Sequence, residues 1–106
     1  MVMRQFDVYL VSLDPTVGHE IKKTRPAVII SPDVLNKNLQ TVIVAPLTHT
    51  IKGYPSRLLT NFDGQQGEIV LDQLRAVDKK RLIKKKGSVD ARTAKNIKTL
   101  LQVMFS

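Results

Sequence analysis

The 106-residue sequence contains no cysteine and no tryptophan, and only three phenylalanines and two tyrosines. Without cysteine the chain has no disulfide framework, no thiolate nucleophile and no cysteine-ligated metal, which fits a reducing compartment. So few aromatic residues argue against a broad platform on which single-stranded bases stack. No apolar run reaches the length of a transmembrane helix, and the first five residues precede a strand-like pattern rather than the apolar core of a signal peptide. We therefore expect a soluble cytoplasmic protein that does not bind membranes.

The sequence also lacks the motifs of most catalytic classes. It has no glycine-rich phosphate loop, no His-x-x-x-His pair and no Gly-x-Ser-x-Gly nucleophile elbow. Glu68 and Asp72 could pair as glycosidase carboxylates, but two acids four residues apart in a predicted strand belong more often to turns and surface contacts. These reaction classes are therefore set aside.

Positive charge is in excess and is concentrated in the second half of the chain. The sequence has 17 Lys and Arg against 9 Asp and Glu, a net charge of +8. Residues 1–53 hold six basic and four acidic residues, whereas residues 54–106 hold eleven and five. From Arg75 to Lys86, seven basic residues accompany the single acid Asp78. This cluster favours a polyanion as partner, although a solvated surface or an anionic membrane would also account for a basic run.

The apolar residues predict strands first and a helix last. Short β-branched runs end at prolines, as at Asp14-Pro15 and Pro46, and Asp63-Gly64 is a dipeptide typical of tight hairpin turns. The run at residues 27–30 is bounded by Pro26 and Pro32 and predicts a strand buried on both faces. The predicted strands are residues 6–13, 27–30, 41–45, 57–60 and 68–71, with weaker candidates at 74–77 and 82–83 and a helical turn within 33–40.

From Asp90 the apolar period changes to that of a helix. Asp90 or Ser88 can cap its first turn, because a short side-chain oxygen accepts the free amide hydrogens there. No repeat or linker divides the chain. We therefore expect one domain, residues 1–106, that is mainly β with a C-terminal α-helix covering a small, strongly curved, barrel-like sheet. The apolar positions with helical spacing are Ala94, Ile97, Leu101, Met104 and Phe105.

Two predicted loops at strand ends hold the residues that can perform chemistry, since rigid scaffolds present functional side chains at such places. The first predicted loop, residues 16–24, contains Gly18-His19-Glu20 and leads into Thr24-Arg25-Pro26. The second, residues 47–55, contains Thr48-His49-Thr50 and Lys52-Gly53-Tyr54-Pro55.

These loop residues and two further motifs together resemble the MazF/PemK (Kid) toxins of bacterial toxin–antitoxin systems. The motifs are Asp14-Pro15-Thr16, Gly18-His19-Glu20, Thr24-Arg25-Pro26-Ala27-Val28, Lys52-Gly53-Tyr54-Pro55 and Asp72-Gln73. Each is weak alone, but their order and spacing extend over nearly the whole chain. The resemblance implies a homodimeric SH3-like barrel. It also implies an endoribonuclease, independent of metals and cofactors, that cuts single-stranded RNA at a short sequence, inhibits translation and growth, and is neutralised by a cognate antitoxin.

The resemblance also implies that Arg25 and Thr48 take part in cleavage. Attack by an internal 2′-OH needs a base, donors for the charge that builds on the phosphate oxygens, and an acid for the leaving 5′ oxygen. Arg25 suits the phosphate oxygens because its guanidinium stays charged and forked, and Thr48 can donate one further hydrogen bond. Arg25 suits the base role badly, since a guanidinium holds its proton firmly. His19 is the candidate base, because imidazole is the side chain that most readily takes up a proton near neutral pH, whereas His49 is interpreted as an exposed loop histidine.

The other residues that match the family, or that lie in the basic cluster, are candidates for RNA binding. Glu20, Asp72 and Gln73 could read base edges, although Glu20 could instead pair with Lys22 or Lys23. The basic residues would contact phosphates, so RNA affinity should fall steeply with salt, and they should attract an acidic antitoxin segment. The candidates are Glu20, Lys52, Tyr54, Asp72, Gln73, Arg75, Lys79, Lys80 and Arg81.

Two departures and two alternative functions accompany this interpretation. Kid-type members have an arginine involved in cleavage where this sequence has Val70, which argues against a pair of active arginines of that type, and Phe6 replaces a usual glycine. A non-catalytic nucleic-acid-binding barrel would need only the basic cluster. A toxin that binds DNA gyrase, as the related CcdB toxins do, would not need Arg25 and Thr48.

Overall fold

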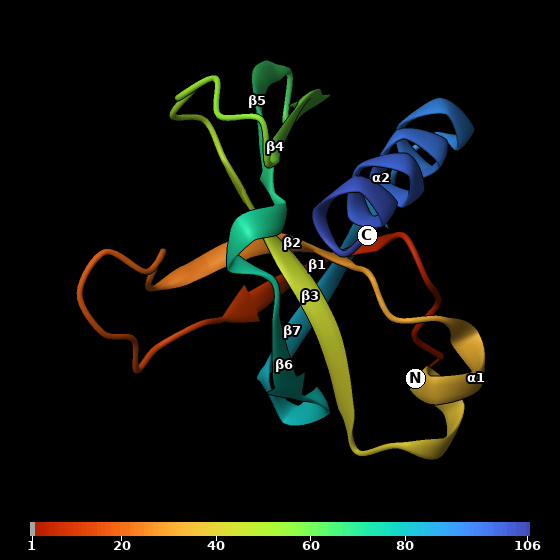
Figure 1. The fold of residues 1–106 in the computed structure, drawn as a ribbon. Helices are drawn as coiled ribbons and strands as arrows, with labels where there is room; N and C mark the ends of the chain where they lie inside the picture. The colour runs from red at the N-terminus through yellow and green to blue at the C-terminus, as the bar shows by residue number, and fades with distance from the viewer. Residues whose placement is uncertain (1) are drawn as a thin grey trace.

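The computed structural model describes residues 2–106, which form an antiparallel, strongly curved sheet with two α-helices. In sheet order the strands run β4-β5-β3-β2-β1-β7, and β6 also pairs with β3. The elements are β1 (Asp7–Ser12), β2 (Thr24–Ile29), α1 (Asp33–Asn38), β3 (Thr41–Thr48), β4 (Arg57–Phe62), β5 (Gln65–Val70), the 3-10 turn η1 (Leu71–Gln73), β6 (Arg75–Asp78), the 3-10 turn η2 (Lys79–Arg81), β7 (Leu82–Ser88) and α2 (Ala91–Met104) (Figure 1).

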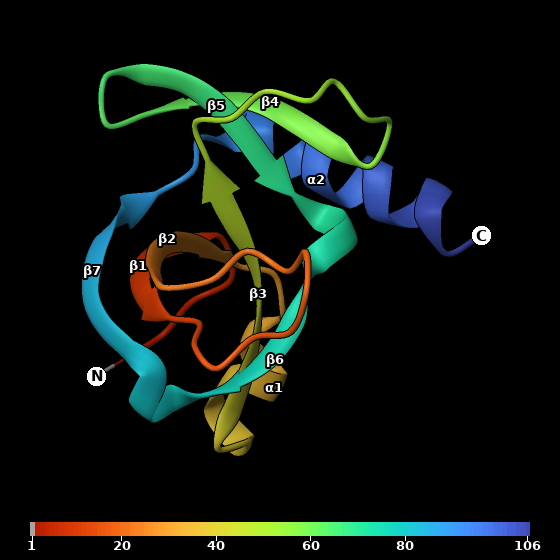
Figure 2. The same cartoon turned by 90° about the vertical axis from the view of Figure 1, so that its left-hand side faces the viewer.

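The long strand β3 organises the sheet, because it changes partner along its length. Residues 41–44 pair with β6, residues 44–46 with β2, and residues 47–48 with β5. Strands β1, β2, β3, β6 and β7 therefore curl around a common centre, while the β4–β5 hairpin leans away from the end of β3 (Figure 2). No pairing closes β6 onto β7 within residues 2–106, so the sheet is barrel-like and open. The predicted fold class, mainly β with a C-terminal helix, is confirmed.

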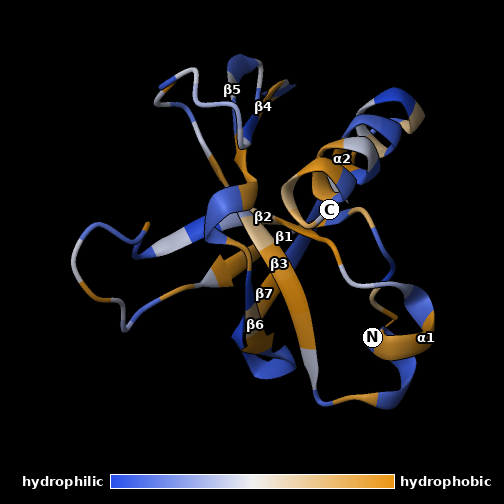
Figure 3. Ribbon diagram, viewed as in Figure 1, coloured by the Kyte–Doolittle hydropathy of each residue, from blue (hydrophilic) through white to orange (hydrophobic). Residues whose placement is uncertain are grey.

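Alternating side chains of the curled strands fill two separate cores, and β3 is hydrophobic along most of its length (Figure 3). On β2, Ala27 and Ile29 point into the inner core, whereas Val28 points to the outer core under α2. All three are fully buried, which confirms a strand covered on both faces. Ile97 is the one fully buried residue of α2 and meets Val28 and Ile69 in the outer core.

Two prolines lie inside strands that the sequence predicts them to limit, so these two predicted strand ends are wrong. Pro26 pairs with Leu10 of β1, but the pairing of β2 with β3 starts only at the next residue. Pro46 pairs with Ala27 at the point where β3 has left β6 and has not yet reached β5. Each proline therefore sits where its strand has a neighbour on one side only, and a missing N–H is tolerated there.

The hairpin and the terminal helix form where the sequence predicts them. Asp63 and Gly64 have φ values of 51° and 71°, the left-handed pair that a two-residue hairpin turn requires. Asp90 caps α2, since its Oδ1 accepts the Thr93 N–H at 2.7 Å, whereas Ser88 ends β7. Strand β7 continues past its predicted end at Ile83, since its pairing with β1 extends to Ser88. It pairs with β1 alone and is therefore an edge strand, and its lysines are exposed to solvent. No helix within residues 2–106 has the length and hydrophobicity needed to cross a membrane.

Candidate active site

Arg25 and Thr48 lie just beyond the paired part of β2 and β3. The last paired positions on this side are Ala27 and Pro46, and each of the two candidates lies two residues beyond its strand's paired residue. Since side chains alternate along a strand, both belong to the face that Ala27 turns toward the inner core. The two strands part at this point, because β3 turns to β5 through Leu47 and Thr48. Arg25 is partly exposed there, whereas Thr48 is buried.

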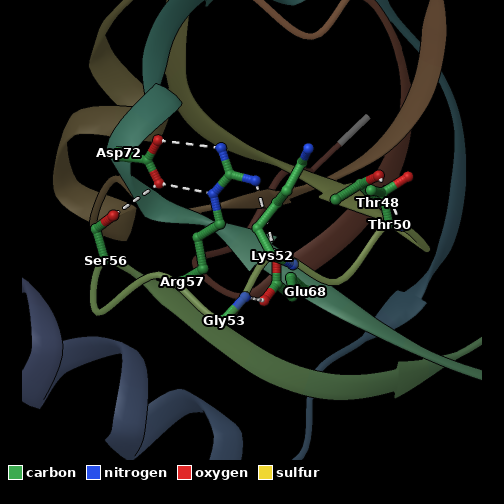
Figure 4. Close-up of polar contacts among 8 residues, drawn as sticks. All are labelled: Thr48, Thr50, Lys52, Gly53, Ser56, Arg57, Glu68 and Asp72. Carbon is green, nitrogen blue, oxygen red and sulfur yellow. Dashed lines mark hydrogen bonds and ion pairs between the residues drawn. The ribbon is translucent and has the colours of Figure 1, made fainter.

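Arg25 and Thr48 each keep a free hydrogen-bond donor. Arg25 Nε donates to the Lys22 carbonyl at 3.1 Å, the single hydrogen bond of this guanidinium to the described residues, so its two terminal nitrogens are available. Thr48 is 7% exposed, and its Oγ1 accepts the Thr50 N–H at 3.2 Å (Figure 4). This contact orients the hydroxyl and leaves its proton free for another acceptor. Arg25 can therefore donate from two further nitrogens, and Thr48 can donate from its hydroxyl.

The β1–β2 loop (residues 13–23) projects from the ends of its two strands (Figure 1) and is tied down at several points. The Ile21 N–H donates to Gln73 Oε1 at 2.7 Å, and the Lys23 N–H donates to Asp14 Oδ1 at 2.9 Å. Glu20 Oε1 accepts the Val17 N–H at 2.6 Å rather than pairing with a lysine. His19 is exposed beside Glu20 and forms no hydrogen bond with Arg25 or Thr48.

A cavity of about 230 Å³ opens between this loop and η1. It combines apolar walls with a polar rim and brings together four of the predicted RNA-binding residues from both halves of the chain. The lining residues are Leu13, Glu20, Ile21, Pro46, Asp72, Gln73, Leu74 and Arg75. Arg25 and Thr48 do not line this cavity, although the lining residue Pro46 lies two residues before Thr48 on β3.

The structure adds Arg57 to the site, a residue that the sequence patterns leave unassigned. Its Nε donates to Asp72 Oδ1 at 3.1 Å and its Nη2 to Oδ2 at 3.4 Å, while Nη1 lies 3.8 Å from Glu68 Oε1 (Figure 4). The Tyr54 ring centroid is 4.8 Å from the guanidinium carbon. Arg57 pairs with Val70 across the hairpin, so an arginine reaches Asp72 from the neighbouring strand. The sequence indicates the position of Arg57 only indirectly, because counting outward from the Asp63-Gly64 turn places Arg57 opposite Val70.

The carboxylates of Glu68 and Asp72 both accept hydrogen bonds from neighbouring residues of the fold and do not form a catalytic dyad. Glu68 is buried and accepts the N–H groups of Lys52 at 3.1 Å and Gly53 at 2.9 Å, which anchors the β3–β4 loop (residues 49–56). Burial by itself raises the pKa of Asp72, but hydrogen bonds from Arg57 and Ser56 outweigh it and hold that pKa below the usual value. Asp72 is therefore an ionised acceptor at the edge of the cavity.

Some side chains of the basic cluster donate hydrogen bonds to backbone carbonyls, and others extend into solvent. Arg75 donates to the Leu13 carbonyl at 3.0 Å, Arg81 to the carbonyls of Ser12 and Asp14, and Lys79 to the Asn36 carbonyl. Their charges remain, but their positions are set by the fold. Lys80 is exposed, and so are Lys52 and Tyr54 of the β3–β4 loop. No cluster of three or more metal-ligating side chains occurs within residues 2–106.

Comparison with known proteins identifies the family. A family model described as "PemK-like, MazF-like toxin of type II toxin-antitoxin system" matches residues 4–105. The chain belongs to the PemK/MazF toxin family. It is 30% identical to Endoribonuclease EndoA of Bacillus subtilis over 100% of this chain and 97% of that protein. It is 33% identical to Endoribonuclease MazF of Staphylococcus saprophyticus over 96% of this chain and 90% of that protein.

Solved structures of the PemK/MazF family share the fold. MazF from Deinococcus radiodurans superposes with a TM-score of 0.86 at 23% identity, over 99% of this chain and 97% of that one. The MazE–MazF structure from the same organism gives a TM-score of 0.81 at 23% identity, over 99% and 96% of the two chains. These similarities agree with the barrel-like sheet and terminal helix described above.

Proposed function

We propose that this PemK/MazF-family protein is the toxin of a type II toxin–antitoxin pair and acts as a metal-independent endoribonuclease on single-stranded RNA. The observation that supports the proposal is that Arg25 and Thr48 both lie just beyond the end of the β2–β3 pairing and both keep free hydrogen-bond donors. The two curated relatives are both named endoribonucleases, and that activity fits a site built to hold a phosphate. Cleavage of mRNA at a short sequence would stop translation and growth.

In the proposed reaction the 2′-OH of the RNA attacks the adjacent phosphorus, and the 5′ oxygen of the next nucleotide leaves. The products are a 2′,3′-cyclic phosphate and a 5′-OH. Arg25 and Thr48 donate to the non-bridging oxygens, where negative charge increases in the transition state. His19 accepts the proton of the 2′-OH, because imidazole readily takes up a proton near neutral pH, and Arg25 donates a proton to the leaving oxygen. The nucleophile comes from the substrate, which suits a chain without cysteine.

The proposed partners follow from charge and from the family. Exposed cations at the rim and on β7, among them Lys52, Lys80 and Lys84, would guide the RNA backbone and attract an acidic antitoxin segment. A cytoplasmic homodimer that binds a cognate antitoxin is part of the proposal. An acidic antitoxin peptide should compete with RNA for this surface, and simultaneous binding of both would refute occlusion as the mode of inhibition.

The test is cleavage of a defined single-stranded RNA by purified protein in EDTA. Arg25→Ala and Thr48→Val should each slow cutting by about 100-fold or more, the usual cost of removing one preorganised donor. Arg92→Ala on α2 is the control for loss of one positive charge, since Arg92 is exposed and lies outside the site. RNA carrying a 2′-deoxy group at the scissile nucleotide should resist cutting.

Each alternative function has its own outcome in this test. RNA that stays intact while binding is retained would indicate a non-catalytic nucleic-acid-binding barrel. Growth arrest on expression, without cutting and without RNA binding, would indicate a toxin with a protein target such as DNA gyrase. Cutting that persists in Arg25→Ala would refute the assigned site.

A further inference from the structure

His49 follows Thr48 directly and stands where β3 stops pairing with its neighbour. In the described part of the chain, only two residue pairs join β3 to β5, and the second of them is Thr48–Glu68. In an antiparallel ladder His49 would next pair with Gly67, but the ladder ends before that pair. The end of the strand that carries the Thr48 hydroxyl is therefore held by few backbone contacts, so side-chain contacts matter there.

The His49 ring makes two such contacts with the β4–β5 hairpin. It stacks on the Phe62 ring, with the ring centroids 4.2 Å apart and the planes inclined by 10°. Its Nδ1 lies 3.4 Å from the Gln66 carbonyl oxygen. A carbonyl oxygen can only accept, so the hydrogen of this contact is on Nδ1. The imidazole therefore meets both strands of the hairpin, because its face lies on the last residue of β4 and its edge on β5.

The Phe62 ring on which His49 stacks is itself fixed by the fold. Phe62 is partly buried and packs against the outer core. A Cβ at Gly67 would lie 2.6 Å from Phe62 Cε1 and 2.4 Å from the Thr48 carbonyl oxygen, so the ring and the Thr48 carbonyl both lie against the Gly67 backbone. His49 consequently stacks on a ring that cannot move far, next to the peptide group that joins it to Thr48.

The backbone around His49 also sets the direction of the Thr48 hydroxyl. Thr48 is buried and His49 is exposed, as expected for successive residues whose side chains lie on opposite faces. Thr48 Oγ1 accepts the N–H of Thr50, the residue after His49, at 3.2 Å (Figure 4). A rotation of the backbone at His49 would therefore move this N–H away from the hydroxyl. The His49 ring acts on the hydroxyl through the backbone and not by contact.

We propose that His49 is a positioning residue, whose stacked ring fixes the end of β3 so that the Thr48 hydroxyl keeps one direction. The inference rests on the proposed ribonuclease function, in which that hydroxyl donates to the phosphate oxygens. It gives a role to a residue that the sequence indicates only as an exposed loop histidine. In this role His49 does not touch the RNA and transfers no proton.

The expected effect of removing the ring lies between two limits. Loss of the Thr48 donor itself should slow cleavage by about 100-fold, whereas a stacked aromatic pair shifts an equilibrium by roughly two- to tenfold. His49→Ala should therefore lower kcat by about five- to tenfold and leave KM nearly unchanged, because the Thr48 donor acts mainly in the transition state. His49→Phe keeps the stacked rings and should stay within about twofold of the wild type.

A double-mutant cycle tests whether His49 acts through Thr48. Thr48→Val has no hydroxyl to orient, so adding His49→Ala to it should change the single-turnover cleavage rate by about twofold or less. A merely structural role of His49 would slow cleavage by the same factor in both backgrounds. Ile51→Ala is the matched control, since Ile51 is exposed in the same loop, and it should cut at the wild-type rate. Urea denaturation shows whether each variant is folded.

Nuclear magnetic resonance separates this inference from the proposed function, because three-bond couplings to the Thr48 methyl carbon report its χ1 rotamer without RNA. The wild type and His49→Phe should each show one rotamer, and His49→Ala an average over several. That pattern in a protein that cuts no RNA would support the inference and overturn the ribonuclease function. A single rotamer in His49→Ala, or an equal loss of rate in the wild-type and Thr48→Val backgrounds, would overturn the inference and leave the ribonuclease function standing.

Discussion

Replacing Gly67 by alanine should damage the site through a steric contact. A Cβ at Gly67 would lie 2.4 Å from the Thr48 carbonyl oxygen and 2.6 Å from Phe62 Cε1. Ordinary contacts with a Cβ begin at 3.4 Å, so the Thr48 backbone must retreat by about 1 Å. Overpacking of this kind costs about 1–3 kcal/mol of unfolding free energy. Because the displaced backbone carries the Thr48 hydroxyl, a shift of about 1 Å should also slow cleavage by roughly 100-fold.

Urea denaturation and single-turnover RNA cleavage measure the two effects of Gly67→Ala separately. Gly64→Ala is the matched control in the same hairpin, because its Cβ would meet nothing within 4 Å although φ is 71°. That variant should lose about 1–2 kcal/mol from the left-handed backbone while its cleavage rate is unchanged. Adding Phe62→Leu to Gly67→Ala removes the ring contact but not the carbonyl contact, so cleavage should stay slow. A Gly67→Ala protein with wild-type stability and wild-type rate would refute the argument.

Three further predictions concern stability, pH and salt. Ile97→Ala should lower the unfolding free energy in urea by about 2–5 kcal/mol, because it empties a fully buried position under α2, whereas the exposed Val103→Ala should change it by less than about 0.5 kcal/mol. The hydrogen bonds from Thr93 lower the pKa of Asp90, so the stability from this cap is complete above the unfolded pKa of about 3.9 and is lost as the pH falls through the lower folded pKa. Asp90→Asn, which keeps a capping oxygen, should match the wild type at neutral pH and lose less stability in acid, as measured by urea denaturation at each pH; equal acid sensitivity would contradict this. Lys80→Ala should reduce the slope of log RNA affinity against log salt concentration by about 0.7 and leave the stability unchanged. Arg81→Ala, which removes the hydrogen bonds to the Ser12 and Asp14 carbonyls, should also lower the melting temperature. An unchanged slope in Lys80→Ala would mean that Lys80 does not contact the RNA.

The elements of the fold were predictable where the signal is local. The short β-branched runs, the Asp63-Gly64 turn and the helical period after Asp90 all act within a few residues, and the corresponding strands, hairpin and helix are present. The strand ends at Pro26 and Pro46 were predicted wrongly. Proline has no N–H to donate, so a strand tolerates it only where no neighbouring strand needs that donor. The number of neighbouring strands at a residue depends on the arrangement of the whole sheet.

The candidate site was predictable in part. The resemblance singled out Arg25 and Thr48, and in the structure both lie two residues beyond the last pair of the β2–β3 ladder, while their roles remain proposals. Arg57 was missed because an isolated arginine at the start of a strand carries no motif. Its place opposite Val70 follows from counting six positions outward from the Asp63-Gly64 turn on each strand, but its hydrogen bonds to Asp72 depend on the position of η1 after β5.

By itself the sequence determined the kind of protein this is: a small, basic, mainly β domain without cysteine, with family motifs at the ends of its strands. Only the tertiary structure decided what each charged residue does. Arg75 and Arg81 stand in the same basic run as Lys80, yet they bond to carbonyls 62 and 69 residues earlier in the chain, while Lys80 stays in solvent. The physical reason is that a side chain's charge is a property of its residue, whereas its partner is supplied by whichever segment the curvature of the sheet brings beside it.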